Sequence, residues 1–326
     1  MILATKSQKK TLGNYASSAI QKHFQKTLKW ETAVKKDKDP EALHQMRVGL
    51  RRLRTTVNGF ALAVDLPQPV SNKNIGKIAH RLGNLRDLDV LKEALETIYK
   101  PNLPRKEQES LQIAFDALDK QREDALVDVK AVLKDERYKS LKKELKEWLE
   151  QPNYQPQASL PIQQVLPDLL FTEASSFLLH PGWLVGTQTS GLEIVVPKDW
   201  EAENIERELA TSGEVLHSLR KQAKRLRYQM ELFTDLYGES YEAYVEEVKS
   251  IQEILGSIQD NVVLSEWLVD VFKSKSYSLP RGLTALLVKN RDELWQQWQL
   301  LQERYLKAET LHGFHSTILR PLSVQL

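Results

Sequence analysis

LHQMRVGLRRLRTTVNGF (43–60) has a second copy further along the chain, LHSLRKQAKRLRYQMELF (216–233). The offset of 173 residues aligns His44 with His217, and it continues without a gap to align Leu82-Gly83 with Leu255-Gly256. A three-residue insertion follows, because the tripeptide LPR at 103 recurs at 279. Self-similarity at a fixed offset predicts a duplicated structural unit. We therefore expect two helical halves related by a pseudo-twofold axis.

Wound as an α-helix, each copy separates its apolar side chains from its cationic ones. The apolar face of the first copy contains Leu43, Met46, Leu50, Leu53, Val57 and Phe60, and that of the second contains Leu216, Leu219, Ala223, Leu226, Met230 and Phe233. Beside it runs a stripe roughly 15 Å long. The first basic stripe is His44, Arg47, Arg51 and Arg54, and the second basic stripe is His217, Arg220, Lys224 and Arg227. We expect the off-stripe Arg52 and Arg225 to pair with Asp87 and Asp260.

Neither basic stripe contains an acid, although the whole chain is nearly neutral with a formal net charge of +2. A single charged stripe is usually a solvated helix face. Two matched stripes of like charge favour another interpretation, because like-charge neighbours on a helix repel unless an anion offsets them. Arginine forks, lysine and histidine all suit phosphate oxygens. If the two halves bring the stripes together, they predict a basic cleft for a linear polyanion.

The helix after the first copy adds cations to one wall of this cleft. Its cationic and titratable residues are Lys73, Lys77, His80 and Arg81, and Lys221 and Arg225 lie beside the second stripe. The corresponding wall positions in the second half are Glu246, Ser250, Glu253 and Ile254. We therefore expect an asymmetric cleft that is more basic towards the N-terminal half.

The rest of the chain predicts an all-α fold, because Gly and Pro are sparse (13 each) and apolar residues recur at helical spacing. The predicted helices cover 7–35, 40–64, 71–98, 105–134 and 136–150, then 162–180, 198–210, 212–236, 240–273 and 281–320, the last with a break near Gly313. WLVGTQTSGLEIVV (183–196) predicts a small inserted β-hairpin. The Pro-rich 151–161 predicts a linker between a first half, 1–150, and a second half, 162–326.

Bulk composition excludes several classes of protein. The 41% of hydrophobic and 28% of charged residues fit a globular protein rather than a disordered one. The absence of cysteine excludes disulfide scaffolds and thiolate metal sites. The N-terminus lacks a signal peptide pattern, and no apolar run approaches the ~18 residues of a membrane span. We expect a cytoplasmic protein with no membrane association, and we leave homo-oligomer formation open.

These motifs resemble the CHAD family, the conserved histidine α-helical domain. EALHQMRVGLRRLR with LGNLRDLDVL, then VLHSLRKQAKRLRY with LGSIQD, match both halves of its signature in order, over about 40–95 and 212–268. The resemblance implies two four-helix bundles about a pseudo-twofold axis, a basic channel that binds inorganic polyphosphate, and association with polyphosphate granules. It assigns binding to His44, Arg47, Arg51, Arg52 and Arg54, and to His217, Arg220, Lys224, Arg225 and Arg227. The hairpin and Glu246 and Glu253 depart from the pattern.

We predict a binding protein rather than an enzyme, with no cofactor, no metal and no catalytic residue. The sequence has no phosphate loop of the GxxxxGK[ST] type, and neither stripe contains a carboxylate for Mg²⁺. A phosphohistidine at His44 or His217 remains an alternative, as does a structural role for either histidine. His312 and His315 lack a third metal ligand.

Nucleic acid and a phosphorylated or acidic protein partner are the alternative ligands. Nucleic acid is disfavoured because only Tyr228 places an aromatic ring beside a stripe, and because the stripes border the core. An interaction scaffold for an acidic partner would use the same cleft.

Overall fold

A computed structural model describes residues 11–191 and 193–322 and consists mainly of α-helices, which confirms the predicted fold class. The first half contains α1 (Leu12–Lys36), α2 (Pro40–Gly59), α3 (Asn72–Arg81), α4 (Gly83–Ala94), α5 (Arg105–Ser110), α6 (Gln112–Val132) and α7 (Glu136–Glu150). The second contains α8 (Ile162–Leu178), α9 (Ala202–Glu231), α10 (Glu239–Ser274), α11 (Arg281–Tyr305) and α12 (Ala308–Ile318). None of the described helices is long and apolar enough to cross a membrane.

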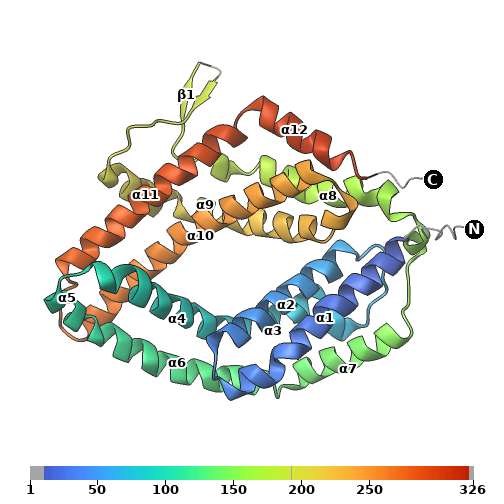
Figure 1. Ribbon diagram of the computed structural model, residues 1–326, viewed down its shortest axis with the longest axis horizontal. Helices are drawn as coiled ribbons and strands as arrows, with labels where there is room; N and C mark the ends of the chain where they lie inside the picture. Colours follow the sequence, from blue (N-terminus) through green and yellow to red (C-terminus); the bar gives the residue numbers. More distant parts are fainter. Residues whose placement is uncertain (1–10, 192, 323–326) are drawn as a thin grey trace, which may run out of the picture.

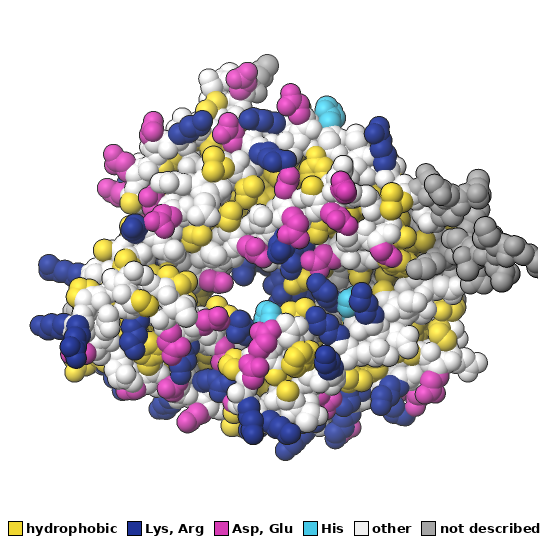
Figure 2. All heavy atoms as spheres, in the orientation of Figure 1, with side chains coloured by type: hydrophobic (Ala, Val, Ile, Leu, Met, Phe, Trp, Pro, Cys, Tyr) yellow, Lys and Arg dark blue, Asp and Glu magenta, His cyan; other side chains and the backbone are white. Residues whose placement is uncertain are grey.

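The helices form two layers that contact each other in two separate regions (Figure 1). In one contact region α2 lies against α9, and in the other α6 lies against α10. Between these regions the molecule is open, and Lys and Arg side chains gather along the edges of the opening (Figure 2). The two layers therefore surround an opening with a partly cationic rim.

Phe60 and Phe233, which the offset of 173 aligns, contact each other where α2 meets α9. Their ring centroids are 5.6 Å apart, and Tyr15 of α1 packs on both rings. Equivalent residues come together in this way when they lie close to a twofold axis. This contact agrees with the predicted internal duplication, which stays a prediction.

The predicted linker is fastened to the first half. The Gln155 amide donates to the Ala63 carbonyl at 3.0 Å, and the Asp65 amide donates to the Asn153 carbonyl at 3.0 Å. A short 3₁₀ helix, Pro156–Ser159, follows before α8. The division into 1–150, 151–161 and 162–326 stays a prediction.

Several predicted helix boundaries were wrong. The helix predicted over 71–98 is interrupted at Leu82, that over 105–134 is interrupted at Leu111, and that over 40–64 ends at Gly59. The helix predicted from residue 7 starts at Leu12 behind the cap of Thr11, and its residues 7–10 lie outside the described residues.

The second half contains two more differences. The predicted helices 198–210 and 212–236 form the single helix α9, and Thr211 lies inside it with its hydroxyl donating back to the Arg207 carbonyl at 3.0 Å. The last helix breaks at Lys307, whereas Gly313 lies inside α12. A Cβ at Gly313 would come within 2.5 Å of the Tyr244 hydroxyl, so this glycine allows α12 to pack closely on α10.

The predicted hairpin is confirmed and is smaller than 183–196. Strands β1 (Gln188–Ser190) and β2 (Glu193–Val195) pair antiparallel, with Thr189 opposite Ile194. Trp183 belongs instead to a 3₁₀ helix (Pro181–Leu184), because its indole is buried and stacks 5.0 Å from the ring of Tyr305.

Candidate functional site

The two helices that carry the basic stripes are fixed by their apolar faces, and α2 also by its N-cap. Helix α2 starts at Pro40 behind Asp39, whose carboxylate accepts from the Glu41 amide at 2.9 Å. The apolar faces predicted for α2 and α9 are buried, with Met46, Leu50 and Leu53 in the first and Leu219, Ala223 and Leu226 in the second all 0% exposed. The predicted winding of both segments is confirmed, and it leaves the cations at the edge of the core.

The basic stripes converge on Lys224. Arg47 and Arg51 from α2, and Arg220 and Arg227 from α9, all act on its half-buried ammonium. Burial, followed by the charges of these four arginines, lowers the pKa of Lys224 to about 7. No carboxylate of the described residues forms an ion pair with it. We call Lys224 and these four arginines the cationic cluster.

A cavity of about 500 Å³ opens beside this cluster, between α2, α8 and α9. We call it the basic cavity; its lining is Arg51, Arg54, Thr55, Asn58, Asn72, Glu173, Lys221, Lys224, Arg225, Tyr228 and Gln229. Five of these side chains are Lys or Arg, and Glu173 is the single carboxylate. Glu173 also accepts a hydrogen bond from the Gln222 amide at 2.7 Å. The arrangement can bind phosphate oxygens with several charge-assisted hydrogen bonds.

Tyr228 forms one wall of the basic cavity and is held by arginines. Arg51 donates to its hydroxyl at 2.8 Å, and the guanidinium carbons of Arg51 and Arg227 lie 5.6 Å and 4.5 Å from the ring centroid. The residue is only 5% exposed. Its ring is therefore a support for two guanidinium groups and is not free to stack on a base.

Arg47 and Arg220 have matching surroundings in the two halves. Arg47 lies 3.9 Å from the Asp87 carboxylate, and Arg220 lies 3.7 Å from that of Asp260. Each guanidinium also covers a glycine of another helix, Gly83 at the start of α4 or Gly256 inside α10. A Cβ at Gly83 would lie 2.9 Å from Arg47, and one at Gly256 would lie 3.1 Å from Arg220. Arg47 further donates to the Ala79 carbonyl at 3.0 Å, near the break at Leu82.

The predicted pairing of Asp87 with Arg52 and of Asp260 with Arg225 was therefore wrong. Asp87 lies close enough to α2 to contact Arg47, and Asp260 lies close enough to α9 to contact Arg220. Arg52 instead forms an ion pair with Glu231 across the two halves at 2.8 Å. Arg225 is exposed, and the bond it donates to the Gln222 side chain is 3.5 Å long.

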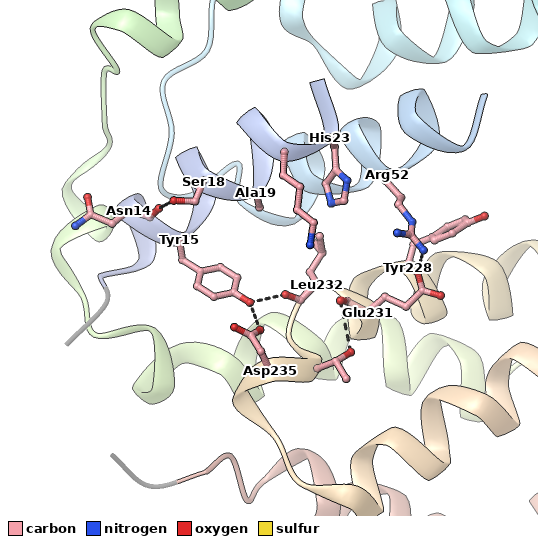
Figure 3. Close-up of a pocket in the computed structure, with 12 residues that line it drawn as sticks. Asn14, Tyr15, Ser18, Ala19, His23, Arg52, Tyr228, Glu231, Leu232 and Asp235 are labelled. Atoms are coloured by element: carbon pink, nitrogen blue, oxygen red, sulfur yellow. Dashed lines mark hydrogen bonds and ion pairs between the residues drawn. The ribbon is translucent and has the colours of Figure 1, made fainter. Parts of the chain in front are cut away.

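Arg52 lies on the other side of Tyr228, in a second cavity of about 610 Å³ (Figure 3). This cavity separates α1 from the end of α9, and Tyr15 crosses it to donate to the Leu232 carbonyl at 2.6 Å. His23 points into the cavity and is only 6% exposed, and burial with nearby cations lowers its pKa to about 4. Because Glu231 and Asp235 also line it, this cavity suits a polyanion less well than the basic cavity.

The remaining predicted residues lie around the basic cavity without lining it. Lys73, Lys77, His80 and Arg81 are exposed on α3, and Arg81 forms an ion pair with Asp135 at 2.7 Å. Glu246 in the second half pairs with Lys249 at 2.8 Å. The structure brings Arg51, Arg54, Lys221, Lys224 and Arg225 together and leaves the α3 cations outside.

His44 and His217 are half-buried beside their arginines. Burial lowers the pKa of both imidazoles, and neighbouring cations lower it further. His217 lines a third cavity, of about 380 Å³, together with Glu206, Glu214 and Glu266. Neither histidine lines the basic cavity.

Thr55, Asn58, Asn72 and Glu173 were missed by the sequence analysis. Thr55 and Asn58 follow Arg51 and Arg54 by four residues, so extending the first basic stripe along its helix would have found them. Asn72 accepts a hydrogen bond from Arg54 across a loop, and Glu173 comes from a distant helix. Nothing local in the sequence signals these two. Among the described residues, no three His, Asp or Glu side chains are grouped to hold a metal ion.

The fold is similar to those of two solved structures. The structure is similar to that of the CHAD domain from the plant Ricinus communis, with a TM-score of 0.59 and 22% identity over 96% of this chain and 94% of that one. It is also similar to PptA from Streptomyces chartreusis, with a TM-score of 0.57 and 11% identity over 95% of this chain and 100% of that one. Both likenesses are likenesses of fold. No curated protein matches the sequence.

The family model of the CHAD domain matches residues 18–269, which include both basic stripes, the cationic cluster and the basic cavity. This match covers well over half of the 326 residues. The chain therefore belongs to the CHAD domain family.

Proposed function

We propose that the protein binds inorganic polyphosphate, without catalysis, in the basic cavity between the two helical halves. The observation that carries the proposal is the cationic cluster, in which a half-buried lysine without a carboxylate partner among the described residues is surrounded by four arginines. Such a group of like charges is unfavourable until an anion enters it. A chain of phosphates supplies regularly spaced negative charges to the cluster and to the other cations of the cavity.

Nucleic acid fits the basic cavity less well. Single-strand binding sites combine cations with aromatic faces on which bases stack. Arg51 and Arg227 lie against the ring of Tyr228, and this residue is almost fully buried. The cavity therefore offers charge without a stacking surface, which favours a polyanion that has no bases.

A binding role also agrees with the surroundings of the histidines. A phosphohistidine nucleophile usually needs a hydrogen-bonded group to orient the ring. The Nδ1 atom of His217 is buried and has no hydrogen-bond partner among the described residues. The family resemblance extends the proposal to a cytoplasmic protein at polyphosphate granules.

A competition titration tests the proposal. Long-chain polyphosphate, single-stranded DNA and single-stranded RNA are compared at equal phosphate concentration and equal salt, with binding followed by anisotropy of a labelled polyphosphate. We expect polyphosphate to bind at least about tenfold more tightly than either nucleic acid. Equal or tighter binding of DNA or RNA would contradict the proposal and favour the nucleic-acid alternative.

A pair of matched double variants locates the site. Lys221→Gln with Arg225→Gln removes two exposed charges from the basic cavity, and Lys143→Gln with Lys289→Gln removes two exposed charges elsewhere. The first pair should weaken polyphosphate binding about tenfold or more, since each lost phosphate contact removes a charge-assisted bond. The second pair should leave affinity nearly unchanged. Equal losses in both would place binding outside the cavity.

A further inference from the structure

Lys224 has the surroundings of a reactive amine. Its ammonium is half-buried at the contact of α2 with α9, and the arginines of the cationic cluster approach it from both helices. Two carboxylates near this contact have other partners, since Asp260 lies 3.7 Å from Arg220 and Glu173 accepts from Gln222. A lysine held in this way loses its proton readily and becomes a nucleophile near neutral pH.

Lys221 provides an internal comparison within the same cavity. It lies one turn earlier on α9 and lines the basic cavity, but its side chain is exposed to solvent. Solvent stabilises the ammonium form of an exposed lysine, whereas burial beside like charges disfavours that form at Lys224. Both amines meet the same dissolved reagents, so Lys221 is an internal reference for the reactivity of Lys224.

The cavity also selects the kind of electrophile that reaches Lys224. The guanidinium groups of Arg51, Arg54 and Arg225 line it, and guanidinium forks bind phosphate oxygens. A small electrophile that carries a phosphate would be held by these groups with its reactive carbon close to the amine. Acyl phosphates have this form, since their phosphate is also the leaving group.

We propose that Lys224 is a site of selective acylation by small acyl phosphates. The neutral Nζ atom attacks the carbonyl carbon, a C–N bond forms, and the C–O bond to the phosphate breaks. The bonding electron pair leaves with the phosphate, which takes up the amine proton and departs as HPO₄²⁻. The product is an amide that has no charge and cannot be protonated at neutral pH.

Acylation would remove the central positive charge of the cationic cluster. The consequence for polyphosphate rests on the proposed function: the acylated protein should bind polyphosphate less tightly, and bound polyphosphate should shield the amine. The acylation reaction itself does not depend on polyphosphate, so the two can be tested separately.

The test treats the full chain with acetyl phosphate, and with acetic anhydride as a reagent that carries no phosphate. Peptide mass spectrometry follows acetylation of Lys224 and Lys221 between pH 6 and 9. With acetyl phosphate at pH 7.5 we expect Lys224 to react about tenfold or more faster than Lys221. Its rate should level off above about pH 7, where the amine is mostly neutral.

The pH profile must be assigned to Lys224 itself, because other charged groups face it. These are Arg47 and Arg51 on α2, His217, Arg220 and Arg227 on α9, and Asp260 on α10. Burial raises the pKa of Asp260 and lowers that of His217, and nearby cations lower the pKa of His217 further. The conservative variant Lys224→Arg should abolish the fast reaction without removing the charge.

Arg225→Gln is the control for phosphate guidance, since it removes one fork and leaves the amine in place. It should lower the rate with acetyl phosphate several-fold and leave the rate with acetic anhydride unchanged. The proposal is wrong if Lys224 reacts no faster than Lys221 with acetyl phosphate, or if Arg225→Gln slows both reagents equally. Loss of polyphosphate protection with fast acetylation intact would contradict the proposed function and leave the acylation site standing.

Discussion

Lys224 lowers the stability of the folded protein at neutral pH. Its pKa in the folded protein is about 7, against an ordinary value of 10.5, because it is buried beside four arginines. Between these two values the unfolded chain binds a proton that the folded chain does not. The free energy of unfolding therefore rises with pH from about 7 to 10.5 through this residue.

Replacing Lys224 by methionine should remove this dependence. The variant keeps the apolar stem and loses the charge, so we expect a gain of about 1–2 kcal/mol in the free energy of unfolding at pH 7, allowing for partial exposure. The gain should shrink as pH rises towards 10.5, because the amine of the unfolded chain also loses its proton there. Urea unfolding of both proteins at pH 7 and pH 10 measures it. A gain that is independent of pH would mean that lost charge is not its cause.

Arg47 and Arg52 reverse the order of structural importance that the sequence suggested. An ion pair of Arg52 with Asp87, as the sequence predicted, would make Arg52→Ala more harmful to the fold than Arg47→Ala. In the structure the Arg47 side chain is 16% exposed and that of Arg52 is 34% exposed. Arg47 also donates to the Ala79 carbonyl, whereas Glu231 keeps Arg227 as a partner when Arg52 is removed.

We therefore expect Arg47→Ala to lower the free energy of unfolding by about 1–3 kcal/mol and Arg52→Ala by less than about 1 kcal/mol. Thermal and urea unfolding of the two single variants under the same conditions provide the comparison. A larger loss for Arg52→Ala would restore the order that the sequence suggested.

Two glycines lie directly beside the stripe arginines, one in α4 and one in α10. Gly83 begins α4 and Gly256 lies within α10, and the guanidinium groups of Arg47 and Arg220 occupy the space where a Cβ would be. A guanidinium is the far end of a flexible side chain, so it can move at small cost. An added methyl group should therefore displace the arginine and leave the helices in place.

Gly83→Ala and Gly256→Ala should each weaken polyphosphate binding several-fold while changing the free energy of unfolding by no more than about 1 kcal/mol. Gly213→Ala in α9 is the matched control, because a Cβ there meets nothing within 4 Å. It should gain stability through helix propensity and leave affinity unchanged. Polyphosphate titration and urea unfolding of the three variants measure these changes. Equal affinities in all three would show that the position of the arginines does not determine polyphosphate affinity.

The elements also show where sequence reasoning succeeded and where it stopped. Apolar residues at helical spacing predicted most helices, because periodicity is a local property that burial then enforces. The break at Leu82 and the close packing at Gly313 depend on partners from other helices, Arg47 and Tyr244. Such partners leave no mark in the local pattern, so these boundaries could not be predicted.

For the molecule as a whole, the repeat predicted a basic site between two halves, but the sequence could not show how the halves are joined. Arg52 and Glu231 are 179 residues apart, and Tyr15 and Leu232 are 217 residues apart. At the other end of the opening, the Glu107 carboxylate accepts from the amides of Gly282 and Leu283 at the start of α11. These bonds connect the layers on both sides of the opening and hold the two stripes at a fixed separation.

The carboxylates beside the arginines have one consequence for the ionic strength dependence of binding. Arg47, Arg220 and Arg227 already lie next to Asp87, Asp260 and Glu231, so the protein supplies the counter-ions of these three cations itself. The five Lys and Arg side chains of the basic cavity form no ion pair among the described residues, although Glu173 also lines the cavity, and they must attract dissolved anions instead. Only dissolved ions enter the solution when polyphosphate binds. At pH 6, where the Lys224 amine is protonated, the slope of log affinity against log salt should therefore count about five charges rather than eight.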